Sequence, residues 1–166
     1  MEKFFWTDLC DNYLEIAKAR LYDGESPGAR YTLHHALLTV TKLLAPFIPH
    51  VTDAVYTGAF AESDGHGSVH ASRWPQPLAG WTSGNEHSVA VGNAILEVTD
   101  AVRRWKSDRK LSVAAPLGHI VVRAPVAICD GLREAARDLV GVTRAGTLSV
   151  EVSDDDAVTV SISALA

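Results

Sequence analysis

The sequence has few cysteines, no long apolar run and no secretion signal, and each absence narrows the class of protein. Its two cysteines, Cys10 and Cys129, have no CxxC partner and lie in apolar surroundings. We expect buried free thiols in a reducing compartment, with a disulfide or a metal site as the alternative. A membrane span is not expected, because no run of about 18 apolar residues is present. A signal peptide is not expected either, and the sequence predicts a cytoplasmic protein.

Catalytic signatures are also absent. The sequence contains no Walker loop and no Rossmann glycine fingerprint, and no catalytic residue is predicted. The histidines do not favour a metal site: His34 and His35 are adjacent and diverge on a helix, while His66 and His70 lie in a glycine-rich loop. The three aspartates at 154–156 predict a turn, because nothing supplies the remaining oxygen ligands of a calcium site.

The composition is that of an ordinary globular protein with an acidic balance. The 166 residues suffice for one domain or for a domain with a small appendage, and 47% of them are hydrophobic. The net charge is −5, so the chain as a whole does not attract nucleic acid. Any binding of nucleic acid must therefore come from a local basic patch.

A pair of prolines organises the first half of the chain. A helix should end before Pro46, whereas Pro49 suits the first turn of a new helix. Phe47 and Ile48 lie between these prolines and are expected to be buried between the two helices. Apolar residues at three- and four-residue steps predict helices over residues 4–21, 29–44, 49–60 and 86–111.

The faces of these helices can also be predicted. Val51 and Val55 are expected to face inward from the third helix. The inner face of the fourth helix is expected to carry Val91, Ala94, Val98, Val102 and Trp105. Residues 68–77 contain two prolines, and we expect an extended segment there that is pinned by Trp74.

The C-terminal part changes period and predicts a β-α-β-β unit. Its expected elements are strands at 119–123, 147–152 and 157–163, a helix at 130–139 and a hairpin turn at 153–156. The predicted fold class is therefore mainly α, a four-helix bundle followed by a small α/β appendage. The bundle is expected to span residues 1–115, with an extended loop over 61–85, and the appendage residues 116–166.

A basic run near the end of the fourth helix is the strongest clue to function. Its five cations are accompanied by a single acidic residue, Asp108, and they are Arg103, Arg104, Lys106, Arg109 and Lys110. One interpretation is a solvated helix end whose cations complement the helix dipole. The other is a ridge that contacts phosphates, with Arg103, Lys106 and Lys110 on one exposed face.

Four segments, in order, resemble motifs of valyl-tRNA synthetases, which are class I aminoacyl-tRNA synthetases. Residues 5–18 resemble a helix of the family, with FWTDLCDNYLEIAK against FW..FCD.YLE..K. Residues 43–53 are similar to the proline corner, with LLAPFIPHVTD against LL.PF.PF.TE, and residues 68–75 resemble SIH...WP. Residues 103–117 are similar to the R..K...L....PL region that follows. The Cys10-Asp11 pair favours the valyl branch over the isoleucyl and leucyl branches.

This resemblance implies the anticodon-binding helical bundle of a valine–tRNA ligase, either excised or free-standing. The HIGH and KMSKS motifs of the catalytic core are absent, so the chain alone is expected to be non-catalytic, and ATP and Mg²⁺ would be bound by the missing core. The implied partners are tRNA, most specifically the anticodon stem-loop of tRNA-Val, and the catalytic domain in cis or in trans. The residues expected to contact tRNA are Arg103, Arg104, Lys106, Arg109, Lys110, Lys18 and Arg20.

Two alternatives remain open at this point. The chain could be the equivalent module of an isoleucyl- or leucyl-tRNA synthetase. It could also be a stand-alone helical scaffold that binds protein through its acidic surface and the aromatic run Phe4-Phe5-Trp6.

Overall fold

The computed structural model describes residues 2–22, 26–78 and 84–163, and within them the protein is mainly helical with a small three-stranded mixed sheet. This confirms the predicted mainly α class. The elements are η1 (Phe4–Leu14), α1 (Glu15–Tyr22), α2 (Pro27–Leu44), α3 (Pro49–Ala59), α4 (Ala61–Asp64), η2 (Val69–Ala71), α5 (Glu86–Asp108), β1 (Leu117–Pro125), α6 (Val126–Glu134), α7 (Ala136–Thr143), β2 (Ala145–Ser153) and β3 (Thr159–Ile162). Across these described ranges, no helix is both long and apolar enough to span a bilayer.

The N-terminal helix has two different windings. The helix predicted over residues 4–21 is present, but its first part, η1, is a π-helix with i→i+5 hydrogen bonds, and only α1 is α-helical. Leu9 and Asn12 of η1 are buried, as is Ala17 of α1. The winding of η1 differs from the α-helical period on which the prediction rests, and Trp6 of this segment is exposed.

The proline corner is present as predicted. Helix α2 begins with Pro27 after Ser26, whose hydroxyl accepts a hydrogen bond from the Ala29 backbone N–H at 3.3 Å. This is the N-cap arrangement that satisfies one of the free donors of a first helical turn. The helix ends at Leu44, and α3 begins at Pro49, where the missing N–H has no cost.

The predicted burial at this corner is wrong. Phe47 is 79% exposed, and α3 turns a different face inward from the one that its apolar residues suggest. That inner face carries Thr52 and the fully buried Tyr56, which shares a core with Phe60 and Val69. The apolar residues left on the exposed side are Phe47, Ile48, Val51 and Val55.

A buried polar network accounts for the orientation of α3. The Tyr56 hydroxyl donates to Asp64 Oδ2 at 2.5 Å, and Lys42 Nζ from α2 lies 2.9 Å from Asp64 Oδ1. Burial raises the pKa of Tyr56 to about 12, together with its bond to Asp64. Burial alone would raise the pKa of Asp64, but the hydrogen bonds from Lys42 and Tyr56 outweigh it and lower that pKa. The network therefore fixes α2, α3 and α4 relative to one another.

The segment after α4 is anchored by a different residue from the one predicted. Trp74 is exposed, so its predicted pinning role is wrong, and the buried residue is Val69. Asp53 of α3 accepts hydrogen bonds from the Ser68 hydroxyl at 2.6 Å and from the Val69 backbone N–H at 3.0 Å. The bond from Ser68 contributes most to lowering the pKa of Asp53. Part of the expected loop, residues 79–83, lies outside the described residues.

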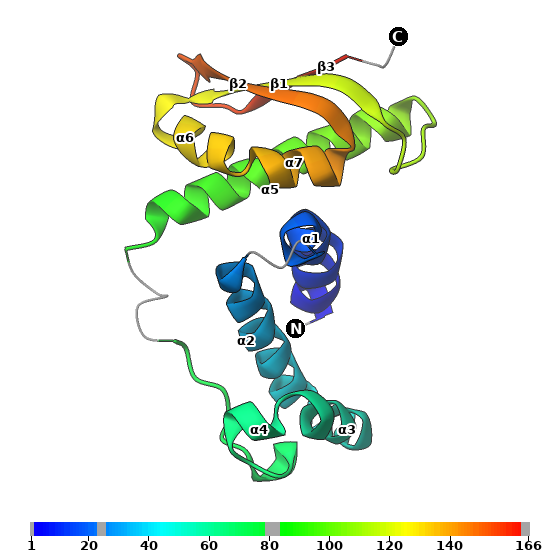
Figure 1. Ribbon diagram of the computed structural model, residues 1–166, viewed down its shortest axis with the longest axis vertical. Coiled ribbons are helices and arrows are strands. Elements are labelled where there is room, and N and C mark those ends of the chain that lie inside the picture. Colours follow the sequence, from blue (N-terminus) through cyan, green and yellow to red (C-terminus); the bar gives the residue numbers. More distant parts are fainter. Residues whose placement is uncertain (1, 23–25, 79–83, 164–166) are drawn as a thin grey trace.

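Helix α5 packs on the C-terminal sheet. Its buried residues Ala94, Val98 and Val102, as predicted, face inward, and they share a core with Ile120 and Val122 of β1. Figure 1 shows the sheet at the top with α5, α6 and α7 beneath it, and α2 running down towards α3 and α4. The expectation of four helices in one bundle is therefore not confirmed, because α5 contacts α6, α7 and β3.

The sheet has the strand order β2-β1-β3. Strand β2 runs parallel to β1, with Ile120 opposite Leu148, while β3 is antiparallel to β1, with Val122 opposite Val160. The strands predicted at 147–152 and 157–163 are present, but they are not a hairpin, because both pair with the central strand β1. A parallel pair needs a crossover of about a dozen residues or more, and here α6 and α7 form it in place of the single helix predicted over 130–139.

Candidate nucleic-acid interface

The basic run lies at the C-terminal end of α5 and in the turn that follows. The helix ends at Asp108, and the backbone N–H groups of Arg109 and Leu111 both bond the carbonyl of Lys106, at 3.1 and 2.9 Å. Lys110 has φ of 57°, the left-handed conformation that commonly ends a helix. The chain therefore reverses within the basic run, and the five cations do not form one helical ridge.

Lys106 corrects the predicted ridge directly. Its side chain is buried, with 1% of the residue exposed, and Nζ donates to the carbonyls of Val113 at 2.6 Å and Thr143 at 2.9 Å. Burial lowers the pKa of Lys106, and the positive charge of Arg144 lowers it further. The prediction that Lys106 faces solvent is wrong: it joins the end of α5, the loop that follows and the end of α7.

Arg103 is also engaged within the protein. Its guanidinium donates to Asn12 Oδ1 and to the Asp11 carbonyl, both at 2.7 Å, and lies 3.4 Å from Asp100. These bonds join α5 to η1 and leave the side chain only partly exposed. Arg103 therefore acts first as a contact between α5 and η1.

Three of the five cations in the basic run are exposed to solvent: Arg104, Arg109 and Lys110. Arg109 lies over the Trp105 ring, with Cζ 4.1 Å from the ring centroid, which is the distance of a cation–π contact. Arg104 has no partner among the residues that the structure describes, and Lys110 projects from the turn. These three cations form the exposed part of the basic run.

The two predicted cations of α1 have different environments. Lys18 is exposed and lies 3.2 Å from Glu15. Arg20 Nε lies 2.9 Å from Asp138 Oδ2 of α7, although the two are not aligned as a hydrogen bond. Burial raises the pKa of Asp138, and the charge of Arg20 only partly opposes it. Arg20 thus holds α1 on α7, while Lys18 remains at the surface.

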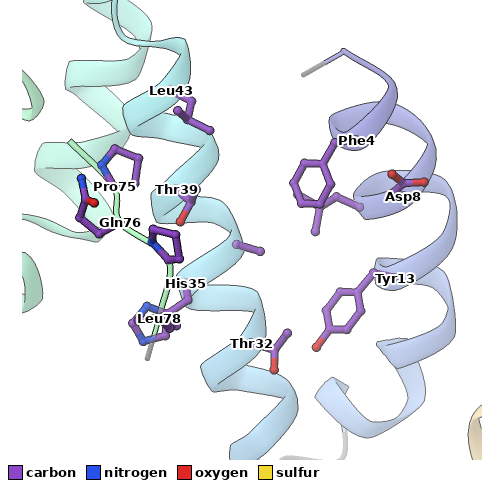
Figure 2. Close-up of a pocket in the computed structure, with 13 residues that line it drawn as sticks. Phe4, Asp8, Tyr13, Thr32, His35, Thr39, Leu43, Pro75, Gln76 and Leu78 are labelled. Carbon is purple, nitrogen blue, oxygen red and sulfur yellow. The ribbon is translucent and has the colours of Figure 1, made fainter. Parts of the chain in front are cut away.

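A second surface feature is an apolar groove between η1 and α2 (Figure 2). Its volume is about 610 Å³, and Figure 2 shows the two helices close together near Tyr13 and Thr32 and open between Phe4 and Leu43. Among the residues that line the groove, Asp8 is the one Asp, Glu, Lys or Arg. Such a surface suits an apolar ligand or side chains of another helix and offers nothing to a phosphate.

The described residues give no support to a metal centre. They contain no group of three or more His, Cys, Asp or Glu side chains placed to hold an ion. Both cysteines are free thiols, and Cys129 is buried with its Sγ 3.3 Å from the Ala124 carbonyl. His34 packs edge-on against Phe60, with 5.2 Å between ring centroids.

Sequence reasoning missed two residues of this region. Arg144 follows α7 with φ of 59°, and its left-handed conformation cannot be read from an unremarkable Thr-Arg-Ala sequence. Asp138 is a buried carboxylate in a helix that was placed correctly only in part. The available signal for Asp138 was its position one residue before Leu139 on the apolar side of the helix.

The sequence is similar to a known domain family and to several known enzymes. A family model described as the anticodon-binding domain of tRNA ligase matches residues 1–122. A valine–tRNA ligase of Rickettsia rickettsii (strain Sheila Smith) is 35% identical over 164 residues, which cover 93% of this chain and 18% of that protein. A valine–tRNA ligase of Haloarcula marismortui is 34% identical over 147 residues, covering 89% of this chain and 15% of that protein.

A third relative shows a similar degree of identity. A valine–tRNA ligase of Methanopyrus kandleri is 35% identical over 161 residues, covering 93% of this chain and 17% of that protein. The chain therefore spans less than a fifth of the length of these curated relatives.

Proposed function

Because the chain belongs to the family of anticodon-binding domains of tRNA ligases, we propose that it binds the anticodon arm of tRNA-Val. The observation that supports this proposal is the exposed basic group Arg104, Arg109 and Lys110 on a chain with a net charge of −5. Phosphate contacts provide the sequence-independent part of nucleic-acid affinity. A concentrated cationic group on an acidic chain directs RNA to this end of α5.

The seven residues predicted to contact tRNA take three roles in this proposal. Arg104, Arg109, Lys110 and Lys18 are the exposed cations that contact phosphates. Arg103 and Arg20 hold η1 and α1 against the C-terminal part. Lys106, which is buried, positions the loop after α5 and touches no RNA.

The chemistry of aminoacylation belongs to other parts of the ligase in this proposal. The catalytic core, in cis or in trans, would bind ATP, Mg²⁺ and valine, and the complete enzyme would act in the cytoplasm. The 166-residue chain alone should give no valine-dependent ATP–pyrophosphate exchange; measurable exchange would contradict this assignment. The division at residue 116 into a helical unit and an α/β unit remains a prediction.

The test is a titration of a fluorescent tRNA-Val anticodon stem-loop at several salt concentrations. Each phosphate contact contributes a slope of about −0.7 to −0.9 in log K against log salt. Replacing Arg104, Arg109 and Lys110 with Gln should therefore flatten the slope by about 2–3 units.

A matched control removes the same charge elsewhere. Its substitutions are Lys3→Gln, Arg30→Gln and Arg73→Gln, all at exposed positions. This control should retain most of the parent slope. Equal slopes for the parent and the Arg104, Arg109 and Lys110 variant would remove the end of α5 from the interface.

A further inference from the structure

A notch opens between α1, α7 and the loop that follows α5. Helices α1 and α7 pack against each other, and the loop closes one side of the space between them. The notch has a volume of about 500 Å³, within the range of about 300–1,000 Å³ typical of ligand sites. The residues that give it chemical character are Glu15, Lys18, Tyr22, Ser112 and Arg144.

Arg144, which lines the notch, has an unusual backbone conformation that it shares with Lys110 in the turn after α5. Among the described residues other than glycine, Lys110 and Arg144 are those with positive φ, at 57° and 59°. Glycine adopts this conformation without the steric cost that a side chain incurs, so it is the usual residue there. The chain instead carries a cation at both positions, one after α5 and one after α7. Residues held in such conformations cluster at ligand-binding sites.

The walls of the notch are fixed by buried contacts. Lys106 bonds the carbonyls of Val113 and Thr143, which immediately precede Ala114 on one wall and Arg144 on the other. The ion pair of Arg20 with the buried Asp138 holds α1 on α7. The notch is therefore preorganised, which reduces the entropy lost when a ligand binds.

The side chains in the notch match the parts of one nucleotide. Tyr22 is 80% exposed, and its ring offers a face on which a base can stack. Arg144 and Lys18 are exposed cations suited to phosphate. Glu15, which lies 3.2 Å from Lys18, can accept a hydrogen bond from a base amino group. The apolar groove of Figure 2 has no comparable set of cations.

We propose that this notch binds one unpaired nucleotide of an RNA loop, with Tyr22 stacking on its base and Arg144 and Lys18 contacting its phosphates. The proposal rests on the function proposed above and names a site within it. It also extends that interface from the end of α5 to the surface formed by α1 and α7. An unpaired base is required, because a paired base has no free face.

The test uses Tyr22→Ala in the 166-residue chain, with Trp74→Ala as the control for loss of an exposed aromatic ring. The probe is a fluorescein-labelled hairpin with the sequence of the tRNA-Val anticodon arm, and the same hairpin with abasic loop residues. Stacking is worth about 1–3 kcal/mol per base, so Tyr22→Ala should weaken binding of the intact hairpin by about 5- to 150-fold. The salt slope should not change, and the abasic hairpin should bind the variant and the parent equally.

A second variant, Arg144→Gly, separates binding from folding. Glycine suits the left-handed conformation at this position, so the melting temperature should be unchanged or higher. The salt slope of hairpin binding should nevertheless flatten by about 0.7–0.9 unit. A structural role for Arg144 at the end of α7 predicts the opposite pattern, with a lower melting temperature and an unchanged slope.

The outcomes distinguish this proposal from the one on which it rests. If the parent binds the hairpin with a steep salt slope but Tyr22→Ala binds like Trp74→Ala, the notch is not the site and the basic end of α5 stands. Equal losses on the intact and abasic hairpins would overturn the stacking role in the same way. If the parent binds no hairpin at any salt concentration, both proposals are overturned.

Discussion

Lys106 allows the most demanding test of this structure, because its side chain is buried although its sequence neighbours are solvated cations. The informative change is Lys106→Met, which keeps most of the apolar stem and removes the ammonium group. In the parent, that group donates at 2.6 Å to the Val113 carbonyl and at 2.9 Å to the Thr143 carbonyl.

The expected loss of stability follows from the hydrogen bonds that the two carbonyls lose. The Thr143 carbonyl bond is buried, and leaving its acceptor unsatisfied costs about 1–3 kcal/mol. The Val113 carbonyl lies on an exposed loop residue and can bond water instead, so its loss adds little. We expect Lys106→Met to lower the free energy of unfolding by about 1–3 kcal/mol. Lys106→Ala also removes three methylenes at about 0.8 kcal/mol each, so it should lose about 2 kcal/mol more.

The assay is urea denaturation followed by circular dichroism, with Arg104→Met as the matched control. Arg104 is exposed and should change the free energy of unfolding by no more than about 0.5 kcal/mol in either direction. The expected order of stability is parent and Arg104→Met, then Lys106→Met, then Lys106→Ala. Equal stability of Lys106→Met and Arg104→Met would refute the buried position and return Lys106 to the solvated basic run.

Three further predictions test the corner, the helix packing and a buried charge. Phe47→Ser should change the free energy of unfolding by less than about 0.5 kcal/mol in thermal or urea denaturation, because the ring is exposed; a large loss would restore a buried corner. Gly92→Ala should stabilise α5 by about 0.5–1 kcal/mol, since no atom lies within 4 Å of the added Cβ. Gly131→Ala should destabilise the protein, since its Cβ would lie 2.5 Å from Val91 Cγ2, and calorimetry measures both effects. The pKa of Asp138 is raised above 3.8, so the folded state binds the extra proton and the parent should lose stability as pH rises from about 3.8 through that pKa. Asp138→Asn should lack this loss, and parallel stability–pH curves for the parent and the variant would contradict the burial of the carboxylate.

Local signals in the sequence were sufficient to place most of the elements. The prolines located the end of α2 and the start of α3, because proline acts on its own helical turn. Periodicity located α5 and its inner residues Ala94, Val98 and Val102. It could not show that α5 packs on the sheet, because an apolar stripe identifies the buried face but not its partner.

Contacts between distant residues account for the errors. The periodicity of α3 favours Val51 and Val55 as inner residues, but the bond of Tyr56 to Asp64 turns the neighbouring face of the helix, with Thr52 and Tyr56, inward. The segment 153–156 has the composition of a hairpin turn, although the chain crosses to the other side of β1 there. Turn composition specifies a reversal of the chain and carries no information on strand order.

At the candidate interface, too, features set by neighbouring residues could be predicted and features set by tertiary contacts could not. The concentration of cations in the basic run was visible in the sequence, and three of its members are exposed. Helical spacing predicts Lys106 on one exposed face with Arg103 and Lys110, yet its partners Val113 and Thr143 are set by tertiary structure. Arg144 was missed because its backbone conformation depends on how α7 ends.

The contact between Arg103 and Asn12 has a consequence for how the protein is made. The two residues are 91 positions apart, and a ribosome that adds about 5–20 residues per second needs about 5–18 s to add that length. Throughout that interval η1 and α1 have been synthesised, but their partners on α5 and α7 have not. The pairing of β1 with β2, in contrast, joins Leu117 to Ala145 and needs only α6 and α7 between them. The C-terminal sheet can therefore form from contiguous chain, whereas η1 can reach its final position, with Leu9 and Asn12 buried, only after α5 has been synthesised.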